Sequence, residues 1–194
     1  ILDKLHTKVK KVRLPRKIEE KSNIYGTDYS HVSSHLENFG FFDFGKIVPD
    51  HLVNSLFNSF TSTKYLKEKY LEHEPVDFIN TENPIFDRYD LDEKKIAQLS
   101  DVQELLFDSF FLKIASCYLE CSPILSNISA WWSFPFVNGD PFEAAQLFHF
   151  DLDRIKWLKF FIYLTDVDHF SGPHCFIPKT HLAGSHPAEF RKRG

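Results

Sequence analysis

The sequence predicts an α+β domain in which helices come first and strands follow, the strands closing a barrel or a sandwich. Three observations support this fold class. Apolar residues recur at helical spacing in the first part of the chain. After residue 127 they fall into short β-rich runs separated by turn residues. The 194 residues, 43% of them hydrophobic, suffice for one domain with a substantial core, which we place at 24–194 after a basic lead-in segment at 1–23.

Helical patterns dominate the first part. A helix is predicted over 30–38, ending near Gly40, and a short strand over 41–44. Pro49 and Asp50 open a second helix, because proline favours the start of a helix. The other elements predicted here are a helix around 64–71, a short strand at 86–89 within a loop, and a helix over 101–120. Cys117 and Cys121 are spaced one helical turn apart and are expected in the core.

Four strands are predicted in the second part, because β-branched and aromatic residues cluster between turn residues. They cover 128–136, 145–151, 157–167 and 175–177. Side chains alternate between the two faces of a strand. One of the neighbours Trp131 and Trp132 must therefore face inward, and plain core packing is the commoner role for such a residue.

Charge and composition exclude several classes of protein. The formal net charge of −4 divides into +5 over residues 1–21 and −9 over the remainder, and an acidic body does not suggest a nucleic-acid partner. The seven glycines form neither a dinucleotide-binding nor a P-loop pattern. No run approaches the roughly 18 apolar residues of a membrane span. Three cysteines without a CxxC pair fit a reducing compartment, so we expect a cytoplasmic protein.

His149 and Asp151 are the strongest candidates for chemistry. Residues two apart on a strand point to the same side, so an imidazole nitrogen and a carboxylate oxygen converge there. With a second histidine, such a pair makes the facial triad of non-heme Fe(II) oxygenases. The surrounding run is otherwise apolar, where a carboxylate is costly unless it is paired or binds metal. The other reading is structural: Asp151 pairs with Arg154 or Lys156 at a strand end, and His149 is a core residue.

The downstream context strengthens the metal reading. Residues 146–151 (QLFHFD), 161–167 (FIYLTDV) and 172–181 (GPHCFIPKTH) resemble the phytanoyl-CoA dioxygenase-like family, and the likeness extends back to about residue 35. The resemblance implies a double-stranded β-helix (a cupin-like jelly roll) with N-terminal helices packed on the sheet. It also implies Fe(II), with 2-oxoglutarate as cosubstrate and dioxygen as oxidant, and hydroxylation of a C–H bond in a small-molecule substrate. His149 and Asp151 would be two of three iron ligands, and a carboxylate at 151 favours hydroxylation over halogenation.

The chain departs from that family in two ways. The family's distal histidine, and the basic residue that holds the cosubstrate's far carboxylate, have no matching pattern here. His186 lies in a loop-like stretch and is a poor third ligand, so we expect the chain to end before the last jelly-roll strands. Lys179 stands where the family usually has glycine in its P-G-(S/T)-H turn.

Other residues are candidates for the pocket. Strand alternation puts Trp157, Lys159, Phe161, Tyr163 and Thr165 on one face. A lysine and a tyrosine together can bind a cosubstrate carboxylate, so Lys159, Tyr163 and Trp132 are the candidates for the cosubstrate. The structural alternative is a lysine extending to the barrel rim and a tyrosine with a backbone partner. Asp153 and Arg154 are candidates for the substrate mouth.

Two other functions fit the same residues. One is a jelly-roll binding protein without catalysis. The other is a cupin-type enzyme that holds Zn or Mn through His149 and Asp151. The presence of a distal histidine and arginine would favour an oxygenase over the binding protein. Turnover of the cosubstrate would favour an oxygenase over the Zn or Mn enzyme.

Overall fold

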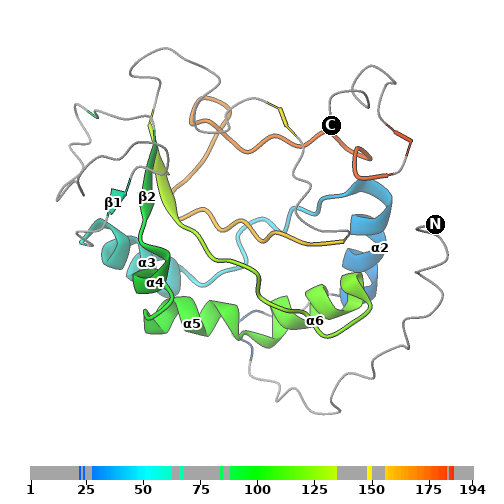
Figure 1. Ribbon diagram of the computed structural model, residues 1–194, viewed down its shortest axis with the longest axis horizontal. Coiled ribbons are helices and arrows are strands. Elements are labelled where there is room, and N and C mark those ends of the chain that lie inside the picture. Colours follow the sequence, from blue (N-terminus) through cyan, green and yellow to red (C-terminus); the bar gives the residue numbers. More distant parts are fainter. Residues whose placement is uncertain are drawn as a thin grey trace.

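The computed structural model describes residues 22, 24, 28–62, 66–67, 84, 88–134, 148–149, 156–182 and 184–185. Over these residues the protein is α+β, with helices and a small antiparallel sheet. Figure 1 shows α2 beside α6 at one end of the molecule, and α3 near the sheet at the other. None of the described helices is both long enough and apolar enough to cross a bilayer.

Helix α2 (Tyr29–Phe39) confirms the helix predicted over 30–38. It begins at Asp28, whose carboxylate accepts hydrogen bonds from the backbone N–H groups of the first turn, including that of Ser30 at 2.9 Å. Val32 and Leu36 form its buried face. The helix ends at Gly40, which has a φ of +84°, a conformation that glycine adopts without a steric penalty.

Helix α3 (Asp50–Thr61) begins where Pro49 and Asp50 predict it, and buries an apolar stripe of Leu52, Leu56 and Phe60. The strand predicted over 41–44 is wrong, because these described residues are not assigned to a strand. Their apolar residues instead pack as separate side chains: Phe42 and Phe44 lie against the α2–α6 core.

The sheet is antiparallel, in the order β1 (Leu66–Lys67), β2 (Arg88–Leu91) and β3 (Trp131–Ser133). The helix predicted around 64–71 is wrong at 66–67, because these residues pair with β2. Strands β2 and β3 confirm the strand signals at 86–89 and 128–136, with shifted or shorter bounds.

Within the described stretch 88–134, three helices follow β2: α4 (Glu93–Ile96), α5 (Ser100–Leu106) and α6 (Ser109–Leu119). A single helix over 101–120 was expected, and the chain breaks it at residues 107–108. The Asp108 carboxylate explains the break, because it accepts a hydrogen bond from Phe110 N at 2.7 Å and so caps a new helix. The core placement of the cysteines is also wrong: Cys117 is exposed and Cys121 half-buried.

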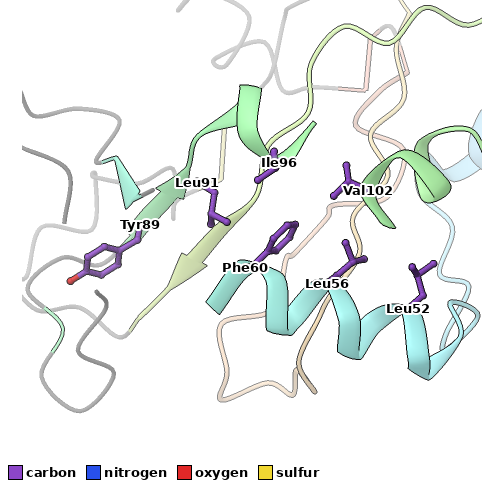
Figure 2. Packing of buried hydrophobic residues seen from close by; sticks show 7 residues of the cluster. All are labelled: Leu52, Leu56, Phe60, Tyr89, Leu91, Ile96 and Val102. Carbon is purple, nitrogen blue, oxygen red and sulfur yellow. The ribbon is translucent and has the colours of Figure 1, made fainter. Parts of the chain in front are cut away.

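The buried apolar residues form two clusters. Figure 2 shows the first, in which Leu52, Leu56 and Phe60 of α3 face Leu91, Ile96 and Val102. The second cluster joins α2 to α6. Its buried members are Ile24, Val32, Leu36, Phe110, Phe111 and Ile114. Val48 and Leu105 pack against both clusters, so the two cores are continuous.

The segment 156–182 crosses the middle of the molecule and ends above the top of α2 (Figure 1). Strands were predicted at 157–167 and 175–177, but these described residues are not assigned to a strand. The predicted strand at 145–151 lies outside the described residues except for 148–149, which are not in a strand either. Apolar alternation alone does not make a sheet, because a strand also needs a neighbour for its backbone hydrogen bonds.

Candidate functional site

The segment 157–165 has two different faces. Leu158 and Ile162 pack against the α2–α6 core, and Leu164 packs against the other cluster. The Phe160 ring is 37% exposed, but it contacts the ring of Phe111 edge to face, with centroids 5.0 Å apart. The even-numbered side chains therefore anchor the segment, and the odd-numbered ones form a separate face. We call the side chains of Trp157, Lys159, Phe161 and Tyr163 the open face.

Side-chain ion pairs tie both ends of this segment to the helical part of the chain. At one end, the Lys156 ammonium lies 4.5 Å from the ring centroid of Tyr118 and 4.0 Å from a carboxylate oxygen of Glu120. At the other end, Lys46 pairs with Asp166 at 2.9 Å, which raises the pKa of Lys46. Both groups of the second pair are exposed, so it contributes little stability.

Lys159 and Trp157 are neighbours on the open face. The Lys159 ammonium lies 4.8 Å from the ring centroid of Trp157, within the range of a cation–π interaction. The contact holds an exposed cation above an aromatic surface. An ammonium group can donate charge-assisted hydrogen bonds to an anionic ligand.

Tyr163 has the backbone partner that the structural alternative expected. Its hydroxyl oxygen accepts a hydrogen bond from His174 N at 2.8 Å. The His174 ring stacks on Phe161, with ring centroids 4.4 Å apart and an interplanar angle of 27°. Tyr163 remains 49% exposed, so the same hydroxyl can still donate its proton to a ligand.

Trp132 is the inward-facing member of its pair. It is half-buried on β3, and its ring lies 5.5 Å from the ring of Phe57 in an edge-to-face contact, whereas Trp131 is exposed. Its Nε1 atom is buried and has no hydrogen-bond partner in the part of the chain that the structure describes. A buried indole N–H without an acceptor is unusual, and a ligand oxygen would satisfy it.

The predicted metal pair is described only in part. His149 is exposed, as is its neighbour Phe148. Asp151, Asp153 and Arg154 lie outside the described residues. Among the residues that are described, no three His, Cys, Asp or Glu side chains come together as a metal site, and this search did not include Asp151. The convergence of His149 and Asp151 stays a prediction.

The motif at 172–181 contacts the end of α2, which the sequence reasoning missed. Lys179 has a φ of +68°, the left-handed conformation that glycine adopts most readily, and its N–H donates to Phe39 O at 2.9 Å. His181 donates from Nε2 to Glu37 O at 2.9 Å. The glycine after α2 was visible in the sequence, but nothing local indicated a partner 144 residues away.

Comparison with known proteins adds no assignment: no family model, curated protein or solved structure matches the chain.

Proposed function

We propose that this protein is an Fe(II)- and 2-oxoglutarate-dependent dioxygenase that hydroxylates a C–H bond of a small-molecule substrate. The observation that carries the proposal is the open face, which holds a lysine and a tyrosine four residues apart, with His174 against the tyrosine. An ammonium and a phenol are suitable donors for a carboxylate, and 2-oxoglutarate carries two carboxylates.

The chain's own residues would have distinct roles at this face. Lys159 would bind one carboxylate of the cosubstrate through a charge-assisted hydrogen bond. Tyr163, whose oxygen already accepts a bond from His174 N, would donate its proton to the same ligand. The indole N–H of Trp132 is buried without an acceptor in the described part of the chain, which supports it as a further cosubstrate donor.

The finer fold proposal is the double-stranded β-helix. The segment 157–165 supports it, because one face packs on the core and the other stays open, as in a strand that lines a barrel. The stretch 172–177 lies beside it through the contacts of His174 with Phe161 and Tyr163. If the two stretches paired as neighbouring strands, backbone hydrogen bonds would join them into a β-ladder.

His149 and Asp151 would hold the iron through an imidazole nitrogen and a carboxylate oxygen, and a second histidine would complete the triad. When bound, the iron and the cosubstrate supply the activation of dioxygen. The donor set fits the metal chemically, because imidazole and carboxylate are its usual ligands in such sites. Asp153 and Arg154 would line the entrance for the substrate.

The test is an anaerobic titration of the protein with Fe(II) and 2-oxoglutarate, followed by the metal-to-ligand charge-transfer band in the visible spectrum. We expect the band in the wild-type protein and in the control variant His169→Ala, which changes an exposed turn histidine. We expect it to be lost in His149→Ala and in Asp151→Ala. No band and no retained iron in the wild type would overturn the proposal and favour a binding protein. Tight Zn or Mn without cosubstrate binding would instead favour the cupin-type enzyme.

A further inference from the structure

Residues 172–182, which we call the strap, are attached at both ends. At the first end, His174 N donates to the hydroxyl oxygen of Tyr163, and the His174 ring stacks on Phe161. The strap therefore touches two members of the open face. Large apolar side chains of the strap, such as Phe176 and Ile177, are exposed. Burial of apolar side chains therefore does not hold the strap in place.

The second end of the strap caps helix α2. The N–H of Lys179 donates to Phe39 O, and Nε2 of His181 donates to Glu37 O, each at 2.9 Å. Carbonyl groups in the last turn of a helix lack partners within the helix, so these two bonds satisfy acceptors that the helix cannot satisfy itself. The Lys179 ammonium also lies 5.5 Å from the ring centroid of Phe39, and a positive charge is favourable at this end of a helix.

Gly40 makes the space for this attachment. A Cβ atom at position 40 would clash with the His181 ring and would lie 2.8 Å from Cζ of Phe176. The ring of Phe176 also contacts the ring of Phe41, with centroids 5.6 Å apart. The positive φ of Gly40 excludes an unstrained side chain there as well. A side chain at position 40 and an attached strap therefore compete for the same space.

We infer that Gly40 and His181 are positioning residues for the candidate cosubstrate site: they hold the strap on α2, and the strap holds the Tyr163 hydroxyl in place on the open face. The identity of the ligand, 2-oxoglutarate, rests on the proposed function. The attachment of the strap to α2 does not depend on it. Because His174 N donates to the Tyr163 oxygen, the phenol proton stays available for a carboxylate. A strap fixed at both ends lowers the entropy lost when the ligand binds.

The attachment is tested without any activity. A nitroxide spin label on Cys175, which is exposed within the strap, reports strap mobility in a Cys117→Ser/Cys121→Ser background. We expect faster label motion in His181→Ala and in Gly40→Ala. In His181→Gln the motion should be close to that of the unsubstituted strap, because the amide N–H replaces the Nε2 donor. The control is His169→Ala. Unchanged label motion in both His181→Ala and Gly40→Ala would overturn the attachment.

A double substitution checks that Gly40 and His181 act through one contact. Gly40→Ala should increase label motion less in the presence of His181→Ala than alone, because the clash of the new Cβ with the His181 ring is then gone and only that with Phe176 remains. Fully additive effects would show that the two residues act separately. Far-UV circular dichroism confirms that each variant remains folded.

The positioning role is tested by the dissociation constant of 2-oxoglutarate in the presence of Fe(II), under anaerobic conditions. We expect about a tenfold weaker affinity in His181→Ala, on the scale of one hydrogen bond, and recovery in His181→Gln. Unchanged affinity in a variant whose strap has loosened would overturn the positioning role. If the wild type binds no 2-oxoglutarate while the label responds as expected, the proposed function fails and the attachment stands.

Discussion

The helical region up to residue 119 and the segment 156–185 use apolar residues in opposite ways. Each fully buried hydrophobic side chain that the structure describes lies between residues 24 and 115. In the described part of 156–185, aromatic residues such as Phe161, Phe170 and Phe176 remain exposed. The two regions have similar apolar sequences, so composition does not explain the difference.

Backbone hydrogen bonding explains why the two regions bury their apolar side chains to different extents. A helix satisfies its own backbone groups, so α2, α3 and α6 need only one buried face to be stable. An extended segment needs partner strands, and 157–165 packs one face on the helices while its other face stays open. The helical region therefore provides stability, whereas the extended region provides surface for a ligand.

The largest expected effect compares two phenylalanines, one from each region. Phe110→Ala should lower the free energy of unfolding by about 3–5 kcal/mol, because this fully buried ring contacts Tyr29, Phe44 and Phe111. Phe170→Ala should change it by no more than about 0.5 kcal/mol, because that ring is 84% exposed. Urea unfolding of both variants measures the difference. Similar losses in the two variants would contradict the division of roles.

A smaller effect compares two aspartates that cap backbone N–H groups. Asp108 is buried and accepts hydrogen bonds from Phe110 N and from the Ser22 hydroxyl, each at 2.7 Å. Asp108→Ala should lower the free energy of unfolding by about 2 kcal/mol, and Asp108→Asn by less, because an amide oxygen still accepts. Asp168 accepts in the same way from Phe170 N, but it is exposed. Asp168→Ala should therefore have a smaller effect in the same urea titration, and an equal loss would contradict this explanation.

The smallest expected effect is a pH dependence at the start of α2. The pKa of Asp28 lies below its usual value of 3.8, chiefly because the Ser30 hydroxyl donates to its carboxylate, as do the N–H groups of Ser30 and His31. A lowered pKa in the folded state means that the ionised group stabilises the fold above the unfolded-state pKa. That contribution is lost as the pH falls through the lowered value. Asp28→Asn should weaken the acid-induced loss of stability, and an unchanged acid unfolding curve would count against this cap.

The sequence predicted the local features well and the distant ones poorly. The helices over 30–38 and from residue 50 follow from spacing and from the end signals Gly40 and Pro49. Alternation placed Leu158, Ile162 and Leu164 on the face that packs on the core, but Phe160 of that face is exposed. The break at Asp108 was missed because a continuous apolar face hid a capping side chain.

The missed features depend on partners far away in the chain. The pairing of 66–67 with β2 overrode a helical pattern, because strand pairing depends on tertiary context. The contact of the strap with α2 joins His181 to Glu37, and neither segment alone indicates it. The left-handed conformation of Lys179 could not be predicted either, because glycine is the usual sequence signal for that conformation.

The most direct test of the account is calorimetric titration of 2-oxoglutarate into the Fe(II)-loaded, oxygen-free protein, comparing Lys159→Ala with Lys94→Ala. Lys94 is an exposed lysine on α4 and serves as the matched control. If the open face binds the cosubstrate, Lys159→Ala should weaken binding by roughly 10- to 100-fold, the range for a hydrogen bond to a charged group, while Lys94→Ala binds as the wild type does. Equal affinities in the wild type and both variants would contradict the assignment of the ligand site to the open face.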